Sequence, residues 1–331
     1  PTRRSSDLSS FDIKLPRDFT LNLGARYSGE TKHAQVQVVG DNGPANPCST
    51  VTQRCGSFGF SDSHTWNSFT PKVGFQWQPA ASTNLYAFWT KGFRSGGYNV
   101  RQTALTSPPG PYDQEVETTF ELGLKQSAFQ KKARVGISLF KNKYRNLQRD
   151  LAFNDAVLGL IQTTLNTADV TVSGVELEGS FIVAHGLTLT ANGGYLHSKI
   201  DRLRRALTSD GIITPSQYNL VLPFLSKFSY GASVVYMRDI GANKLTSNLS
   251  YQHSDAAFSN DLNINKLNPI NVLDGSLALE IGGTGISVSA YAKNMLNKVY
   301  FGLNNNIGVP PSTLAPLGKG RVLGLEMRFK Y

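Results

Sequence analysis

The sequence ends in GLEMRFKY (Gly324 to Tyr331), and every second side chain of this segment is apolar or aromatic: Leu325, Met327, Phe329 and Tyr331. The positions between them are charged: Glu326, Arg328 and Lys330. Successive side chains of a β-strand point to opposite faces, so the segment predicts a strand with one apolar and one charged face. Such a strand fits a soluble sandwich, or an outer-membrane barrel whose apolar face meets lipid and whose charged face meets a watery lumen.

The same alternation recurs along the chain. Clear examples lie at residues 19–27, 116–124, 133–139, 187–195, 228–236, 273–281 and 286–292. We expect about thirteen strands and no amphipathic helix, and so many strands curl or close rather than form one open sheet. The apolar parity changes once, at Ser173–Gly174, between Val172 and Val175, and we expect a β-bulge there.

The composition agrees with a strand-rich chain. The 331 residues include 31 Gly, 18 Phe and 13 Tyr, and 40% of residues are hydrophobic, which favours turns and aromatic strands. No apolar run approaches the roughly 18 to 20 residues that a membrane-spanning helix requires, so a helical membrane protein is excluded. A barrel stays possible, since its strands carry apolar residues only at alternate positions.

Short and long connections between the expected strands alternate. The short polar ones are residues 16–18, 79–82, 127–130, 183–186, 238–243 and 282–285, and the long ones are 28–64, 94–114, 149–164, 201–221, 254–269 and 302–317. All short connections should therefore lie at one end of the sheet, an asymmetry typical of outer-membrane barrels. Loops beyond about 15 residues are uncommon in compact soluble domains. The pattern predicts an all-β protein, a transmembrane antiparallel β-barrel.

Four segments carry a family resemblance. In chain order they are TKGFRSGGYN (Thr90–Asn99), PYDQEVETTFELGLK (Pro111–Lys125), NTADVTVSGVELEG (Asn166–Gly179) and AYAKNMLNKVYF (Ala290–Phe301). Together they resemble the C-terminal barrel of TonB-dependent outer-membrane receptors of the siderophore-receptor kind. The resemblance implies a 22-stranded barrel around a plug domain, a size also known for plugged outer-membrane transporters. This chain would supply about the last 13 strands, without the plug and the first strands.

The resemblance also implies a function. The intact protein would be a receptor in the outer membrane of a Gram-negative bacterium, a multi-pass barrel that takes up a scarce ligand with energy from TonB, which acts through the plug. Ferric siderophores are the commonest ligands of the subgroup, while cobalamin, haem and oligosaccharides are also used in the family. Two alternatives stay open: a passive porin-like channel and a soluble carbohydrate-binding β-protein.

The segment GFRSGG enters an extracellular loop at the top of a strand in the family. This position implies that Arg94, Tyr98 and Arg101 contact an anionic ligand. The alternative is that the glycines of the motif only permit a tight loop entry.

No catalytic arrangement is visible. The five histidines are scattered, and no nucleophile elbow, Walker loop or HExxH helix occurs, so we expect neither an enzyme nor a bound cofactor. Cys48 and Cys55 lie in one long loop of the predicted extracellular end, and an even cysteine count in an oxidising compartment predicts a disulfide. Two free thiols are the alternative. No His or acidic residue lies at a suitable spacing for a metal site.

The chain has a net charge of +10, and its basic clusters lie near the predicted outer rim, at residues 141–149 and 202–205. There they would meet the anionic groups of lipopolysaccharide or attract acidic ferric chelates. Nucleic acid is the generic partner of a basic protein, but no binding module is recognisable, so we expect none.

The two ends of the chain carry separate expectations. Residues 1–8 (PTRRSSDL) resemble a translated sequencing adapter and are expected to be a non-native scar, which leaves residues 9–331 as the partial barrel. The alternative is a polar loop that enters a strand at Phe11. At the other end, the resemblance implies that Met327, Phe329 and Tyr331 form the signal read by the barrel-assembly machinery.

Overall fold

Thirteen antiparallel strands form the main sheet, as the alternation predicted. The computed structural model describes residues 2–37, 59–99, 109–155, 159–208, 211–307 and 312–330. The sheet has the order β1-β2-β3-β4-β5-β6-β7-β8-β9-β10-β13-β14-β17, so each strand pairs with its neighbours along the chain. Its strands are β1 (Thr2–Leu15), β2 (Phe19–Gln37), β3 (Gly59–Ala80), β4 (Thr83–Arg94), β5 (Glu115–Ala128), β6 (Ala133–Asp155), β7 (Gly159–Ala184), β8 (Leu187–Leu203), β9 (Phe228–Ile240), β10 (Asn243–Ser254), β13 (Ile270–Ile281), β14 (Ile286–Lys293) and β17 (Val322–Phe329).

The remaining elements lie in the long connections. They are the hairpin of β11 (Ala257–Phe258) and β12 (Lys266–Leu267), the hairpin of β15 (Asn305–Ile307) and β16 (Ser312–Leu314), and the 3₁₀ helix η2 (Pro215–Asn219). Among the described residues, no helix has the length and apolar character needed to cross a membrane.

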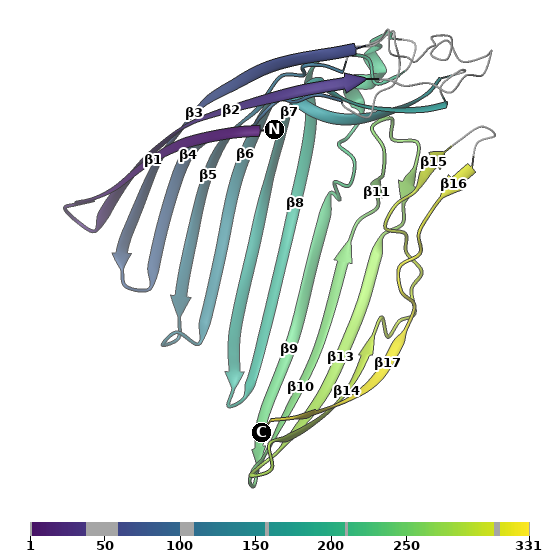
Figure 1. Cartoon of the computed structure of the whole chain (residues 1–331). Coiled ribbons are helices and arrows are strands. Elements are labelled where there is room, and N and C mark those ends of the chain that lie inside the picture. The colour runs from purple at the N-terminus through teal and green to yellow at the C-terminus, as the bar shows by residue number, and fades with distance from the viewer. Residues whose placement is uncertain are drawn as a thin grey trace.

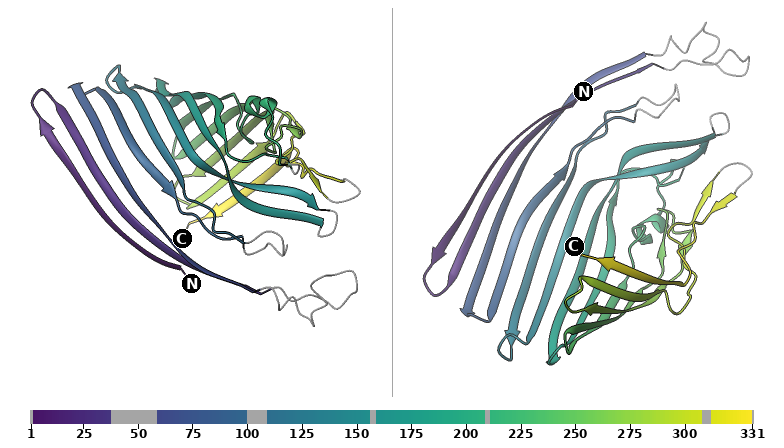
Figure 2. Two further views of the ribbon diagram at one scale, coloured as in Figure 1. Left: turned by 90° about the horizontal axis from the view of Figure 1, so that it is seen from above. Right: turned by 60° about the horizontal axis from the view of Figure 1, so that its bottom comes forward.

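The main sheet curls into an open trough (Figures 1 and 2). Strands β1 and β17 form its two edges, and within the described residues the sheet does not close on itself. The short turns lie along one end of the trough and the long connections along the other, which confirms the predicted alternation (Figure 1). We call these the short-turn end and the long-loop end.

Left-handed backbone conformations make the short turns tight. Arg17 and Asp18 have φ values of 60° and 62°, and Gly186 and Gly241 have values of 77° and 60°. Positive φ at the turn centre matches the twist of a two-stranded ribbon, which is why short hairpins favour it. The polar and glycine-containing links of the sequence therefore form hairpin turns at the predicted places.

The apolar residues of each strand point out of the trough. For example, Met327 and Leu325 on β17 pair with Val288 and Ala290 on β14. The exposed fraction of Leu325 is 82%, and that of Phe120 on β5 is 50%. An exposed apolar face over the whole sheet is the arrangement that lipid requires of a membrane barrel.

The inner face is polar and carries tyrosines that lie over glycines of the next strand. A Cβ atom added at Gly123 would lie 2.3 Å from Tyr86 Cζ, and one added at Gly324 would lie 2.3 Å from Tyr291 Cζ. The Tyr86 hydroxyl also donates a hydrogen bond of 2.8 Å to Glu121. Each glycine thus provides the space in which a ring packs across two strands, and this explains the glycine of the ELGLK motif.

The bulge expected at Ser173–Gly174 is wrong. Strand β7 pairs there with β6 and β8 in unbroken register. The register shifts lie elsewhere: between Tyr144 and Gln148 on β6, and on β7 between Asp169 and Val170 and, beside the short turn, between Ile182 and Ala184. Val170 is instead buried on the inner face, in a cluster of Leu151, Ala168, Val170, Ile200, Leu203 and Leu207. The parity changes because the inner face itself becomes apolar where loop residues cover it.

Several boundaries also differ from expectation; the connection expected at residues 28–64, for example, begins only after Gln37 and ends before Gly59. The connection predicted at residues 149–164 is mostly strand, because β6 continues to Asp155 and β7 begins at Gly159. Residues 2–8 belong to β1 and pair with β2, from Thr2 opposite Lys32 to Leu8 opposite Arg26, so a polar loop at this position is wrong. The origin of residues 1–8 stays a prediction.

Candidate ligand site at the long-loop end

The GFRSGG segment forms a strap across the long-loop end. The chain leaves β4 at Arg94 and runs beside residues 109–114. The amide of Gly97 donates to Tyr112 O at 3.2 Å, and the amide of Tyr112 donates to Gly97 O at 2.9 Å. These reciprocal bonds join the two motif segments that the sequence placed on either side of one long loop. We call residues 95–99 the strap.

Close packing explains two of the three glycines in the motif. A Cβ atom at Gly96 would lie 2.1 Å from Tyr112 O and 2.3 Å from Trp66 Nε1, and one at Gly97 would lie 2.6 Å from Tyr112 Oη. At Gly92 the nearest atom would be 3.9 Å away. Only glycine allows the strap to approach the aromatic rings so closely at Gly96 and Gly97. The structural explanation of these glycines therefore holds, and it leaves the role of Arg94 open.

Lys32 anchors the strap to the sheet. Its ammonium group donates to Ser95 Oγ at 2.8 Å and to Gly96 O at 2.5 Å, and it lies 3.5 Å from Glu30 Oε1. It also lies 5.4 Å from the centre of the Trp66 ring, within the range of a cation–π contact. Sequence reasoning missed Lys32, because a single lysine within a strand carries no motif.

A cavity of about 500 Å³ opens beside the strap. Its charged lining residues are Arg26, Lys32 and Arg94, with Glu30 as the one carboxylate. Arg94 is exposed and forms no ion pair with a described residue. Three cations against one carboxylate give the cavity a positive potential, which attracts anionic ligands. The guanidinium group of Arg94 can bind a carboxylate or catecholate through two parallel hydrogen bonds.

Tyr98 is held on the other side of the strap by protein groups. Its hydroxyl donates to Asp62 Oδ2 at 2.8 Å, and its ring packs edge-on against Phe60 and Trp66. Burial, followed by the hydrogen bond to Asp62, raises the pKa of Tyr98 to about 12, so the phenol is neutral at physiological pH. Tyr98 is not among the residues that line the cavity. These contacts join Tyr98 to β3, and its assignment as a ligand contact stays a prediction.

Four of the predicted site residues lie outside the described residues. Arg101, Cys48 and Cys55 belong to this group, and so does Tyr331 at the chain end. Their assignments as ligand contact, disulfide and assembly signal stay predictions.

Amide side chains join the strap to β6 and β7. Asn99 and Thr164 exchange two hydrogen bonds of 3.0 and 2.7 Å, and Asn166 makes the same reciprocal pair with the backbone of Asp113 at 2.7 and 2.9 Å. Gln148 donates to Ser95 O and to Asp113 O, both at 3.0 Å. Such amides pair with backbone groups where no strand neighbour is available. The motif asparagine at 166 is therefore a structural clamp, and the motif was its only signal in the sequence.

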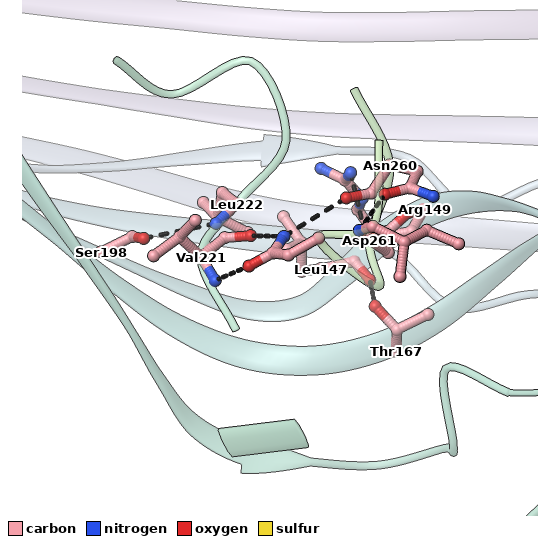
Figure 3. Close-up of polar contacts among 10 residues, drawn as sticks. Leu147, Arg149, Thr167, Ser198, Val221, Leu222, Asn260 and Asp261 are labelled. Atoms are coloured by element: carbon pink, nitrogen blue, oxygen red, sulfur yellow. Dashed lines mark hydrogen bonds and ion pairs between the residues drawn. The ribbon is translucent and has the colours of Figure 1, made fainter. Parts of the chain in front are cut away.

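A second network closes the long loops over β6 and β8 (Figure 3). Arg149 Nη2 lies 2.7 Å from Asp261 Oδ1. Asn263 accepts from the Val221 amide at 2.8 Å and donates to Val221 O at 2.9 Å. The Leu222 amide donates to Ser198 Oγ at 3.3 Å. Two loops far apart in sequence are thereby fastened to the inner face of the sheet.

The C-terminal segment keeps its alternation as far as the structure describes it. Met327 and Phe329 lie on the outer face opposite Val288 and Ile286. Among the described residues, no group of three or more His, Cys, Asp or Glu side chains is arranged to hold a metal ion.

Comparisons with known proteins give the family. A family model described as "TonB dependent receptor-like, beta-barrel" matches residues 6–327. The pesticin receptor of Yersinia enterocolitica is 22% identical over 249 residues, which are 75% of this chain and 34% of that receptor. This chain therefore spans about a third of the length of that relative.

Two solved structures share the fold. The ferric yersiniabactin uptake receptor FyuA from Yersinia pestis has a TM-score of 0.80 at 19% identity, covering 100% of this chain and 46% of that one. The siderophore receptor PiuA from Acinetobacter baumannii has a TM-score of 0.75 at 16% identity, covering 100% of this chain and 43% of that one. Since the family model covers nearly the whole sequence, the chain belongs to the TonB-dependent receptor-like β-barrel family.

Proposed function

We propose that this chain is the barrel portion of an outer-membrane receptor of a Gram-negative bacterium, which takes up a ferric siderophore with energy from TonB. Family membership supports a receptor or transporter and argues against an enzyme, a passive porin and a soluble carbohydrate-binding protein. The printed names of FyuA and PiuA refer to ferric yersiniabactin uptake and to a siderophore receptor. These names support the ligand class for this chain by analogy.

The observation that carries the ligand class is the cationic cavity beside the strap. Many ferric siderophores are anionic chelates with carboxylate or catecholate oxygens. Arg94 and Arg26 are the two exposed guanidinium groups of this cavity, and Lys32 adds to its positive potential. We propose Arg94 as a direct ligand contact, with Arg101 as a second one from the following loop. Tyr98 would act by fixing the strap that leads from one to the other.

The remaining partners follow from the proposed setting. TonB would act through a plug domain carried elsewhere in the complete receptor, and the barrel-assembly machinery would read the C-terminal strand. Outer-membrane lipid, including lipopolysaccharide, would surround the apolar outer face.

An uptake assay tests this function. The complete receptor is expressed in a strain that lacks its own siderophore receptors, and uptake of radiolabelled ferric siderophores is measured with and without TonB. We expect uptake that is saturable and lost without TonB, whereas a passive channel would keep it. The Arg94→Ala variant should raise the half-saturating concentration on the order of tenfold, because a hydrogen bond to a charged group contributes about 1.5–3 kcal/mol.

Two matched variants complete the test. Arg94→Lys keeps the charge but not the paired donors, so its effect should be intermediate. Lys244→Ala removes a cation beside the short turn at residues 241–242 and should leave uptake unchanged. Equal effects of Arg94→Ala and Lys244→Ala would contradict the assignment of Arg94.

A further inference from the structure

Three lysines stand in register across the outer face of five neighbouring strands. Lys91 on β4 pairs with Thr118 on β5, and Thr118 pairs with Lys143 on β6. Lys143 pairs with Thr171 on β7, and Thr171 pairs with Lys199 on β8. We call Lys91, Lys143 and Lys199 the lysine belt. Neighbouring strands lie about 4.8 Å apart, so consecutive lysines of the belt are attached roughly 10 Å from one another.

The belt lies at the border of the apolar outer face, on the side of the long loops. Two positions closer to the short turns, the same register gives a mixed row of Trp89, Phe120, Lys141, Ser173 and His197. Another two positions toward the short turns, the same register gives an apolar row of Ala87, Leu122, Leu139, Val175 and Tyr195. The outer surface therefore changes from apolar to cationic within two rows.

In the basic cluster that begins at Lys141, the alternation of the strand puts the cations on one face and the residues between them on the other. Lys141, Lys143 and Arg145 are exposed on the outer face, whereas Asn142 and Tyr144 between them point inward. From the sequence, this cluster had two possible anionic partners at the outer rim, lipopolysaccharide or an acidic ferric chelate. Its cations lie on the face opposite the lumen, so the register favours the lipid.

The outer surface around the belt has an excess of positive charge. Lys91, Lys143 and Arg145 form no ion pair with any described residue. Lys199 lies 4.0 Å from Asp201, and both side chains are largely exposed. Lys91 lies 5.8 Å from the centre of the Trp89 ring, as expected of a lysine whose stem lies on an apolar surface while its charge reaches the headgroups.

We propose that the lysine belt binds the phosphate groups of a phosphorylated glycolipid, the lipid A portion of lipopolysaccharide, in the outer leaflet. This inference rests on the proposed outer-membrane setting. Lysines at headgroup depth would contact the phosphates, while the acyl chains lie against the apolar row below. A lipid with more than one phosphate matches a row of several separated cations better than a lipid with a single phosphate does.

Native mass spectrometry of the complete receptor in a neutral detergent tests the proposal. Bis-phosphorylated lipid A, dephosphorylated lipid A and phosphatidylglycerol are added in turn. The belt variant Lys91→Gln/Lys143→Gln/Lys199→Gln should bind bis-phosphorylated lipid A on the order of tenfold more weakly, or weaker still. The reason is that each cation near an anionic headgroup adds to the electrostatic attraction. The control Lys72→Gln/Lys125→Gln/Lys244→Gln removes the same charge from the inner face and should bind like the wild type.

A second variant guards against misfolding. Lys91→Arg/Lys143→Arg/Lys199→Arg keeps the charges and should retain binding, and heat-modifiable mobility shows that each variant is folded. Three outcomes would overturn the proposal: unchanged binding by the glutamine belt variant, equal loss in the control, or equal wild-type affinity for either of the other two lipids. Failure of the proposed uptake function would show separately, as wild-type receptor that folds but takes up no chelate.

Discussion

Arg149 and Asp261 form an ion pair of 2.7 Å that joins the long extension of β6 to the connection between β11 and β12. The exposed fractions of the two side chains are only 23% and 18%, so water screens the pair less than it screens a surface pair. The neighbouring Asn263 fastens the same loop to Val221. This loop is therefore fastened to the sheet by a few polar contacts, and its closure should respond to pH and to single substitutions.

The closure of this loop should depend on pH through Asp261. Burial raises the pKa of the Asp261 carboxyl above 3.8, and Arg149 opposes this effect. A carboxyl with a higher pKa in the closed state binds its proton more tightly there, so closure strengthens as pH falls through the raised pKa toward 3.8. Hydrogen exchange of the amides at residues 260–265, corrected for intrinsic rates, should slow over that window. The Asp261→Asn variant should lose this dependence, and an unchanged profile in the variant would contradict the assignment.

The strap should tolerate alanine at one glycine and not at another. Gly96→Ala places a Cβ atom 2.1 Å from the backbone oxygen of Tyr112, which cannot rotate away, whereas Gly92→Ala meets nothing closer than 3.9 Å. We expect Gly96→Ala to displace the strap at a cost of about 1–3 kcal/mol. Ferric siderophore uptake should fall markedly for Gly96→Ala and little for Gly92→Ala. Equal uptake by the two variants would show that the close approach at Gly96 is unimportant.

Period-two alternation predicted most of the fold because one face of each strand meets an apolar surface and the other a polar one. It located the hairpin turns and the outer face of β17, with Leu325, Met327 and Phe329. It failed at Val170 and Val172, where loops cover the inner face and make it apolar, and it ended β6 too early, because Asp155 and its neighbours extend beyond the apolar band. The alternation of apolar and polar residues reflects whether each face of a strand meets an apolar or a polar environment. It therefore misleads where loops cover the inner face, and it does not mark where a strand ends beyond the apolar band.

The candidate site was predicted only in part. The sequence placed Arg94 and Tyr98 close together, in and directly after the GFRSGG motif, but their surroundings depend on Lys32, Asp62 and the neighbouring aromatic rings. These partners come from other strands and are single residues without a motif. Likewise, no local pattern marks Arg149 and Asp261 as partners, since the long connections bring them together only in the folded chain.

The disulfide between Cys48 and Cys55 should form in the receptor isolated from the outer membrane. Closing so small a ring stabilises the loop by roughly 2 to 3 kcal/mol in the chain-entropy account. Mass spectrometry of unreduced protein should reveal the linked peptide, and reduction should leave the barrel folded because the ring lies outside the described strands. Free thiols in freshly isolated receptor would rule out the bridge.

The C-terminal strand should be needed for assembly beyond its contribution to packing. Deleting Tyr331, or replacing Phe329 by Asp, should block membrane insertion of the complete receptor, whereas Lys330→Gln should be tolerated. A charge on the lipid face costs roughly 2–4 kcal/mol for Arg or Lys at the midplane and less for acids or near an interface. A severe defect from Phe329→Asp near the rim therefore indicates recognition of the terminus. Normal heat-modifiable barrel after both changes would refute this role.

The most direct test of the account is the membrane orientation of the complete receptor on intact cells. An epitope inserted at Ser209 lies in a long connection, and one inserted at Gly241 lies in a short turn between β9 and β10. If the long-loop end is extracellular, antibody should label the Ser209 insertion on intact cells and the Gly241 insertion only after the outer membrane is permeabilised. Equal labelling of both insertions on intact cells, or labelling of Gly241 alone, would contradict the proposed orientation and the ligand site built on it.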